Sequence, residues 1–208
     1  LDPPGRALYL PVGMAREGRP IGVDELLGKL RVVSDGPLTV SEVIRPRVER
    51  LLEQKVEGVT FAMTTSGDGL EVIGATEGDT SASPLGLALD IGTTKLVMYL
   101  VNIKTGEVVD VDSDYNDQIL YGEDLLTRIE YARTRPEGTE TLKRAVVASV
   151  NRLVEKLLSR NSLDPAHVID MSLAGNTVMN HLAVGQNPSY LSETNVPVSR
   201  KPVVSKAG

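Results

Sequence analysis

The chain reads L-G-L-A-L-D-I-G-T-T-K over residues 85–95 and continues with L-V-M-Y-L-V over residues 96–101. The two apolar runs have the length and composition of buried β-strands, and the short polar stretch between them leaves room only for a tight turn. The pattern therefore predicts a β-hairpin. Its turn brings one carboxylate, one glycine and two hydroxyl groups to a single point of the fold.

The groups in this turn suit a bound phosphate. Gly92 lets backbone N–H groups approach an anion without an intervening Cβ, and consecutive amides form an anion-binding concavity. Thr93 and Thr94 can add hydroxyl donors, while Asp90 can hold Mg²⁺, directly or through water, during phosphoryl transfer. The same residue types are common in ordinary hairpin turns, where they bond only the turn's own amides. Both interpretations are open on residue types alone.

Composition limits the classes of function. The formal net charge of −6 and the lack of long Lys/Arg clusters argue against nucleic acid or an anionic membrane as the main partner. The absence of cysteine excludes disulfides, thiolate nucleophiles and cysteine-bound iron–sulfur or zinc sites in these residues. No apolar run approaches the roughly 20 residues of a membrane-spanning helix, and no signal-peptide pattern opens the chain. A cytoplasmic location is therefore expected.

Turn-forming residues divide the chain into three expected parts. Residues 1–40, rich in proline and glycine, are interpreted as a linker region with a few strands and a short helix. Residues 41–84 are expected to form a small α+β middle domain, with a helix from Ser41 to about Gln54 packed on a hairpin. In residues 85–208 a third strand is expected near 108–112, helices at 125–132, 140–160 and 178–184, and a further strand at 168–174.

The D-I-G-T-T turn between two apolar strands resembles the first phosphate motif of the superfamily of acetate and sugar kinases, Hsp70 and actin (ASKHA). Members of this superfamily bind ATP between two lobes, each a sheet flanked by helices. The resemblance implies an α/β (α+β) fold class. It also implies that residues 85–208 form the truncated first lobe of an actin-like, RNase H-like domain with a mixed sheet.

Three further segments are similar to the reductive activators of corrinoid proteins. Residues 116–129, N-D-Q-I-L-Y-G-E-D-L-L-T-R-I, resemble the N-x-Q…G-x-D-x-x-x-R-I segment of that family. Residues 174–188, A-G-N-T-V-M-N-H-L-A-V-G-Q-N-P, resemble its G-N-T-x-M-x-H-L-x-x-G segment, and V-I-G-A-T-E-G-D-T at 72–80 resembles the end of its middle domain. The resemblance covers roughly residues 41–200.

This resemblance implies a repair function. Such activators use ATP to drive electron transfer onto the cobalt of a methyltransferase corrinoid cofactor that has strayed to Co(II), and the product is methyl-accepting Co(I). The implied parent protein is an ATPase of anaerobic metabolism that uses ATP and Mg²⁺, and its partners are a corrinoid protein, of the cobalamin type, and an electron donor. A homodimer is one open oligomeric state.

The family's [2Fe–2S] cluster lies in an N-terminal ferredoxin-like domain, which this cysteine-free chain is expected to lack. The chain is also expected to end before the second phosphate motif and the adenosine-binding lobe. By itself it is therefore expected to be inactive and to bind ATP weakly or not at all.

By resemblance, Asp90 carries over as the catalytic and Mg²⁺-binding residue, with Gly92, Thr93 and Thr94 as phosphate contacts. Lys95 departs from the family, which more often has a third threonine there, so it is either a cation beside the phosphates or a solvated lysine. Gly175, Asn176 and Thr177 follow a strand and precede a helix, a position that commonly faces ligand in α/β folds. Asn176 can instead be a helix N-cap.

The family signature comprises Gln118, Gly122, Asp124 and Arg128, together with Glu123. These polar residues suit a cleft wall or a surface that meets the corrinoid protein. The alternative is helix capping with an Asp124–Arg128 ion pair at i, i+4. Two other classes of function also stay open for the chain, a non-redox actin-like filament or scaffold protein and an acetate- or sugar-type kinase.

Overall fold

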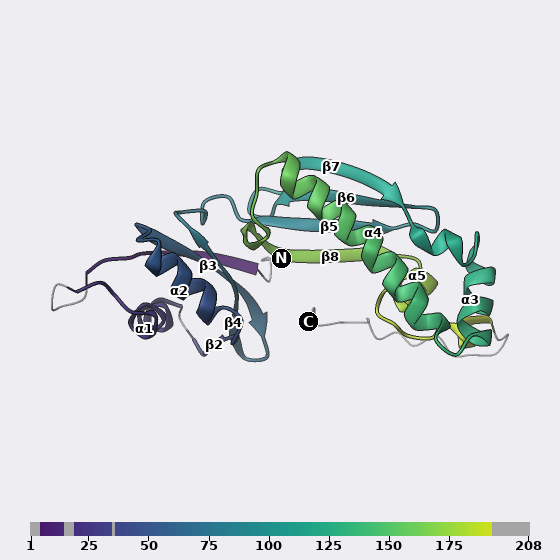
Figure 1. Ribbon diagram of the computed structural model, residues 1–208, viewed down its shortest axis with the longest axis horizontal. Coiled ribbons are helices and arrows are strands. Elements are labelled where there is room, and N and C mark those ends of the chain that lie inside the picture. The colour runs from purple at the N-terminus through teal and green to yellow at the C-terminus, as the bar shows by residue number, and fades with distance from the viewer. Residues whose placement is uncertain (1–4, 15–18, 35, 193–208) are drawn as a thin grey trace. The chain divides into compact units, whose positions relative to one another are not determined.

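The computed structural model describes residues 5–14, 19–34 and 36–192, so the expectations for residues 193–208 lie outside the described part. The chain divides into two compact units. The first comprises the described residues of 1–87, 101–108 and 163–171, and the second those of 88–100, 109–162 and 172–208. Figure 1 labels most of the helices and strands of both units. Among the described residues, no helix has the length and apolarity that crossing a bilayer requires.

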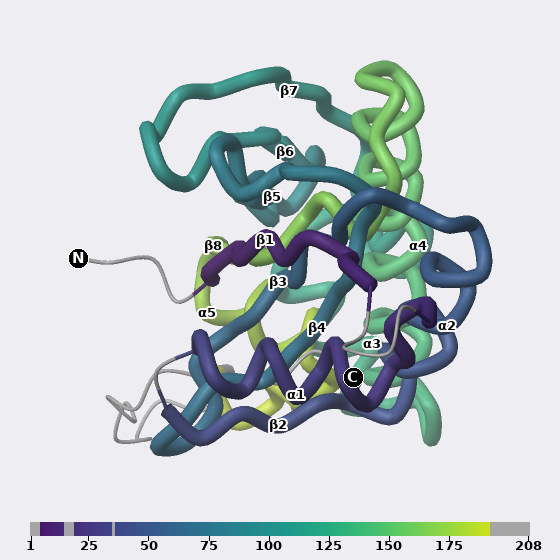
Figure 2. Tube along the Cα trace, turned by 90° about the vertical axis from the view of Figure 1, so that its left-hand side faces the viewer, coloured from purple at the N-terminus to yellow at the C-terminus, as the bar shows by residue number. Residues whose placement is uncertain are grey.

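The first sheet has four strands in the order β1-β3-β4-β2. β3 and β4 form the antiparallel hairpin that the sequence predicts, and Gly67 in its turn has a φ of 58°, a left-handed conformation that glycine adopts readily. β1 pairs antiparallel with β3, beside which it runs in Figure 2, and β2 pairs parallel with β4. The strands are β1 Gly5–Pro11, β2 Leu38–Val40, β3 Gly58–Ser66 and β4 Gly69–Glu77.

Two helices, α1 (Val23–Val33) and α2 (Arg45–Glu53), bury their apolar residues in the core of the first unit. The sequence predicts Ser41 as the N-cap of this helix, but the N-cap of α2 is Ile44, three residues later. The reason is Pro46, which lacks an N–H and would break the helical hydrogen-bond ladder if the helix began at Ser41. At the second helical position this missing donor costs nothing.

Residues 5–11, 23–33 and 38–40 belong to the same sheet and core as the hairpin, although the sequence analysis placed them in a linker region. The prolines and glycines stand between these elements or at their ends. Pro11, for example, closes the edge strand β1, where proline is tolerated. The apolar runs between these breakers are long enough to form β1, which pairs with β3, the helix α1, and β2, which pairs with β4.

The second sheet has the order β7-β6-β5-β8. The three-residue turn after β5 joins it to β6, and so short a connection requires antiparallel strands. A Cβ on Gly86 would lie 3.4 Å from the Asp170 carbonyl oxygen, and one on Gly175 would lie 3.0 Å from that of Ile91. The beginnings and the ends of β5 and β8 are thus adjacent, so these two strands run parallel and the sheet is mixed. The strands are β5 Leu85–Ile91, β6 Lys95–Asn102, β7 Val108–Tyr115 and β8 Val168–Gly175.

The helices expected after β7 and β8 are confirmed. α4 carries a stripe of buried residues that includes Leu142, Val146, Leu153 and Leu157, the residues that the helical period indicates. The helices are α3 Leu125–Thr134, α4 Gly138–Arg160 and α5 Thr177–Ala183, with 3₁₀ turns η1 Asp117–Leu120, η2 Pro165–His167 and η3 Ser189–Ser192.

β7 is an edge strand in which partly buried aspartates alternate with exposed residues. Asp110, Asp112 and Asp114 are partly buried and form ion pairs with the basic residues of α4. Each carboxylate also accepts a hydrogen bond from the N–H of the next residue, at 2.7–2.8 Å. Asp170 on β8 accepts in the same way from the Met171 N–H, at 2.8 Å. Polar contacts, rather than apolar ones, therefore fix α4 along this strand.

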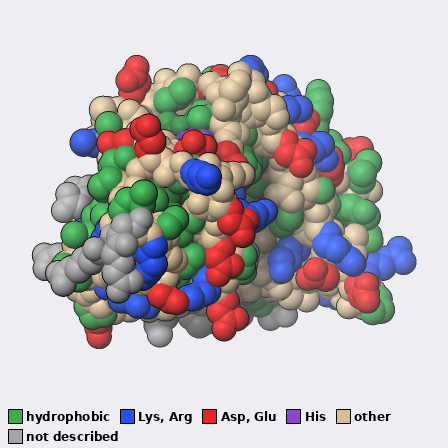
Figure 3. Space-filling view, turned by 60° about the vertical axis from the view of Figure 1, so that its left-hand side comes forward, with side chains coloured by type: hydrophobic (Ala, Val, Ile, Leu, Met, Phe, Trp, Pro, Cys, Tyr) green, Lys and Arg blue, Asp and Glu red, His purple; other side chains and the backbone are tan. Residues whose placement is uncertain are grey.

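Charged side chains elsewhere on the surface are mixed in sign. On the coloured part of the face shown in Figure 3, red carboxylates and blue basic side chains alternate. This distribution agrees with the net charge of −6, but the absence of a nucleic-acid partner stays a prediction.

Replacement of Asp110 tests the contact between β7 and α4. Hydrogen bonds from Arg160 and Asn161 lower the pKa of Asp110 to about 2, from an ordinary value of 3.8. A group with a lowered folded-state pKa stabilises the fold above its unfolded value, and this contribution is lost as pH falls from about 4 through about 2. Urea unfolding of wild type and Asp110→Asn across this range should therefore show a stability difference that shrinks with acid. Arg160→Met should behave like Asp110→Asn, and a difference that stays constant with pH would contradict the assignment.

Candidate functional site

The turn at residues 92–94 is held by hydrogen bonds to all three of its carbonyl oxygens. Asn116 Nδ2 donates to the Gly92 carbonyl at 3.0 Å, and the Asn116 backbone N–H donates to that of Thr94 at 2.9 Å. Between them, Arg128 Nη2 donates to the Thr93 carbonyl at 2.6 Å. Two residues thus determine the orientation of three consecutive peptides.

This arrangement also determines where the amides of the turn point. The described residues contain no cis peptide bond, and in a trans peptide the N–H points opposite to the carbonyl. Because the three carbonyls face Asn116 and Arg128, the N–H groups of Thr93, Thr94 and Lys95 point away from that pair. Consecutive amides with one common direction are what an anion-binding concavity requires.

Gly92 is required by a close backbone approach. A Cβ at this position would lie 2.3 Å from the Lys95 carbonyl oxygen, a distance that real Cβ atoms essentially never show. The glycine therefore permits a turn this tight, as the sequence analysis expected from its position.

The side chains around the turn differ in exposure. Asp90 is exposed at the end of β5, between the buried residues Leu89 and Ile91. The Lys95 ammonium lies 5.4 Å from the centroid of the Tyr115 ring, a cation–π contact that neither interpretation of this lysine foresaw. Among the described residues, no group of three His, Cys, Asp or Glu side chains could hold a metal by itself. A magnesium ion here would depend on Asp90, water and phosphate oxygens, a set that Mg²⁺ commonly uses.

The turn at residues 175–177 lies beside the first one, because Gly175 approaches Ile91. Asn176 is the N-cap of α5, and its Oδ1 accepts from the Met179 N–H at 3.0 Å. Asn180 Nδ2 in turn donates to the Gly175 carbonyl at 3.0 Å. The capping role of Asn176 is thus present, and a phosphate contact by Asn176 or Thr177, both exposed, stays a prediction.

The signature residues have separate roles. Gln118 and Arg128 are buried, whereas Asp124 is exposed and caps α3 in a reciprocal arrangement with Thr127. Hydrogen bonds from the Thr127 N–H and hydroxyl lower the pKa of the Asp124 carboxyl. The helix capping expected as the alternative role of Asp124 is therefore present. The expected Asp124–Arg128 ion pair is wrong, because the Arg128 guanidinium donates to carbonyl and amide oxygens instead.

Gly122 also contacts Arg128, through its backbone carbonyl. The Gly122 carbonyl accepts from Arg128 Nε at 2.8 Å. A Cβ on Gly122 would lie 2.9 Å from the Arg128 backbone nitrogen and 2.7 Å from the Thr127 hydroxyl oxygen, so a side chain does not fit. Gln118, Gly122 and Arg128 thus form the inner support of the turn and not an exposed cleft wall.

Asn116 is a further residue of the site, beyond those predicted from the sequence. It is buried, and besides holding the turn it accepts a hydrogen bond from the Gln118 N–H at 3.1 Å. In the sequence, the asparagine of the N-x-Q pattern pointed to Asn116. The burial of Arg128 could also have been predicted, since Arg128 stands at the helical spacing of Leu125, Ile129 and Ala132.

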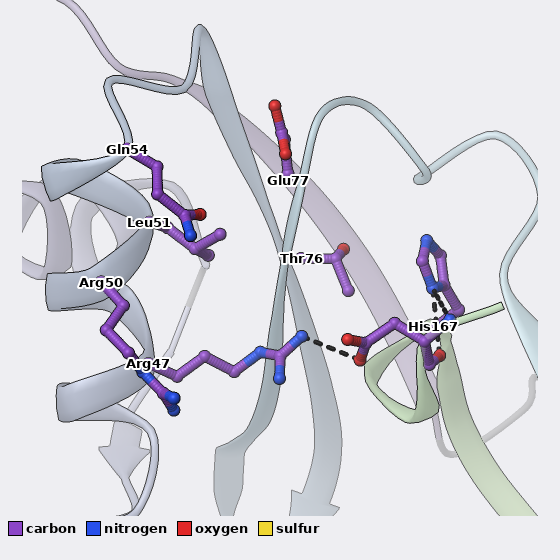
Figure 4. A pocket seen from close by; sticks show the side chains of 8 residues that line it. Arg47, Arg50, Leu51, Gln54, Thr76, Glu77 and His167 are labelled. Carbon is purple, nitrogen blue, oxygen red and sulfur yellow. Dashed lines mark hydrogen bonds and ion pairs between the residues drawn. The ribbon is translucent and has the colours of Figure 1, made fainter.

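A separate cavity of about 490 Å³ lies in the first unit (Figure 4). Arg47 crosses it, and its Nη2 lies 2.8 Å from the Asp164 carboxylate. None of the expected site residues contributes to the lining, which consists of Arg47, Arg50, Leu51, Gln54, Thr76, Glu77, Asp164 and His167.

Comparison with known proteins identifies the family of the chain. Residues 85–208 match the family described as the RACo middle region. The chain belongs to the RACo middle-region family. This membership confirms the resemblance to reductive activators of corrinoid proteins, and the expected α+β fold class with an actin-like lobe is confirmed as well.

The chain is similar to parts of two longer proteins. The corrinoid activation enzyme RamQ of Eubacterium limosum is 33% identical over 106 residues, which are 51% of this chain and 18% of RamQ. The solved structure of a reductive activator for corrinoid, iron–sulfur protein is 27% identical, with a TM-score of 0.67 over 93% of this chain and 31% of that one. The chain thus spans less than a third of the length of either relative.

The close approach at Gly92 yields a test of the turn. Gly92→Ala should destabilise the protein by about 1–3 kcal/mol, the usual cost of overpacking, because the new methyl group meets the Lys95 carbonyl. Urea unfolding measures the change. Gly13→Ala is the matched control, since a Cβ there meets nothing within 4 Å. Equal stability of the two variants would contradict the turn geometry.

Proposed function

We propose that this chain is part of an ATP-dependent reductive activator, which returns the Co(II) corrinoid cofactor of a methyltransferase corrinoid protein to Co(I). Membership of the RACo middle-region family carries this proposal. The names of both relatives support it, since one is a corrinoid activation enzyme and the other a reductive activator for a corrinoid, iron–sulfur protein.

The proposal assigns the turn at residues 92–94 to the phosphates of ATP. Its amides share one direction, and Gly92 permits so tight a turn because a Cβ there would meet the Lys95 carbonyl. Thr93 and Thr94 would add hydroxyl donors, and Lys95 would add a positive charge. The turn at residues 175–177 would contact the phosphates from the opposite side. Asp90 would hold Mg²⁺ through water.

ATP, when bound with Mg²⁺, supplies the free energy for an electron transfer that is otherwise unfavourable. The reaction adds one electron to Co(II) and gives Co(I). The electron comes from an external donor, by way of the [2Fe–2S] cluster that the family resemblance implies elsewhere in the parent protein. The residues described above bind and orient the nucleotide, while cobalt undergoes the redox change.

The proposal extends to the setting of the reaction. The parent protein would be a cytoplasmic ATPase. Its domains would divide near residue 84, whereas the expected division near residue 40 falls within the first sheet and its core. A filament protein or a sugar-type kinase would share the phosphate turn, but family membership favours the activator over both.

Cobalt spectroscopy tests the proposed activity. The protein that carries this chain is mixed with a Co(II) corrinoid protein, a reductant, Mg²⁺ and ATP, and the spectrum should change from Co(II) to Co(I) only when ATP is present. Asp90→Asn should slow the change by about tenfold or more, because the Mg²⁺ site loses its carboxylate. Asp68→Asn, on the β3–β4 turn, should react like wild type. Co(II) that persists equally with and without ATP would refute the proposal.

A further inference from the structure

Arg128 is a charged side chain in an unusual environment. It is fully buried, with a relative exposure of 0%. Its guanidinium donates to the Gly122 and Thr93 carbonyls and, at 3.2 Å, to both Gln118 Oε1 and the Met179 sulfur. All four acceptors are neutral.

Among the described residues, no carboxylate is bonded to the positive charge of Arg128. Asp124 is close enough to favour the charged form, but its carboxylate is exposed and occupied in capping α3. Burial accordingly lowers the pKa of Arg128. Burying a charge without a bonded counter-ion costs desolvation free energy. A neutral donor could hold the Thr93 carbonyl at a lower desolvation cost.

The bond between Arg128 and the Thr93 carbonyl allows the buried charge to act on the turn. The Thr93 carbonyl, 2.6 Å from Arg128 Nη2, belongs to the same peptide as the Thr94 N–H. Because this peptide is trans, the N–H points away from the guanidinium. A cation at the carbonyl end polarises the peptide and strengthens the N–H as a donor at the other end.

We infer that Arg128 is a positioning residue for anion binding at the turn, which it serves by fixing the Thr93 carbonyl and by polarising the Thr93–Thr94 peptide toward a bound phosphate. The inference rests on the proposed nucleotide function, because it takes the same turn as the phosphate site. Arg128 itself does not touch the ligand.

The surroundings of Arg128 keep the guanidinium in this orientation. Gln118 Oε1 accepts from it, while Gln118 Nε2 donates to the Leu142 carbonyl of α4 at 3.0 Å. The Gly122 carbonyl holds Nε on the other side of the planar group. A lysine would keep the charge but could not make this set of contacts, because an ammonium lacks the planar fork.

The test uses the protein that carries this chain, labelled with ¹⁵N at threonine and lysine, and inorganic tripolyphosphate with Mg²⁺. It follows the NMR amide shifts of residues 93–95. Wild type should show a saturable shift centred on the Thr94 amide. Arg128→Met should weaken tripolyphosphate binding by about tenfold, because the Thr93 carbonyl loses its charged donor and the Thr94 N–H becomes a weaker donor to phosphate. In the free protein it should also move the Thr94 amide proton upfield. Arg128→Lys, with the charge kept and the fork lost, should fall between the two.

A control separates this role from a loss of stability. Ile129 is the next residue of α3, is buried and apolar, and is not bonded to the turn, so Ile129→Ala should lower stability and leave tripolyphosphate affinity unchanged. If Arg128→Met does not fold, Arg128→Lys decides the matter.

The outcomes distinguish this inference from the proposed function. Wild-type affinity in a folded Arg128 variant would overturn the role of Arg128 and leave the proposed function standing. No response of the wild-type turn amides would overturn the inference together with the phosphate assignment, whereas the cobalt experiment tests the activator function independently.

Discussion

Three consecutive carbonyl groups, those of residues 92–94, accept hydrogen bonds from Asn116 and Arg128. The conformation of the turn is thus imposed from outside the hairpin. A hairpin alone would leave these peptides free to rotate toward water, and their dipoles would then have to be reoriented around each ligand. Dipoles that are already aligned cost no reorganisation when an anion arrives, which is the physical basis of a preorganised electrostatic site.

The same constraint connects the turn to the helices of the second unit. Gln118 bonds the α4 backbone at Leu142, and the Asp117 N–H donates to the Ser149 hydroxyl at 3.0 Å. Arg152 holds the Asp117 carboxylate at 2.6 Å and thereby lowers its pKa. η1 is therefore a bridge between the phosphate turn and α4. This explains why a segment with so little regular structure contains two fully buried polar side chains, Asn116 and Gln118.

The local parts of this fold could be predicted from the sequence, and the long-range parts could not. Turn chemistry predicted the hairpins, and helical spacing predicted α4 nearly to its ends. The pairing of β1 with β3 was missed, because it joins residues about fifty positions apart and the breakers around β1 suggested a linker. At the site, residue types identified the phosphate turn. They did not show that Arg128 lies beneath it, because burial of a cation depends on acceptors contributed by Gly122, Gln118 and Thr93 together.

The aspartates of the second sheet have a consequence for assembly. β7 and β8 are its two edge strands, and an unpaired edge offers amides to which a strand from another chain can add. On β7 the amides of Val111, Ser113 and Tyr115 already donate to the preceding aspartate, and on β8 the Met171 amide does the same. The carboxylates that bind α4 thus also block their own strand's donors. A single residue type both attaches a helix and protects the sheet against edge-to-edge aggregation.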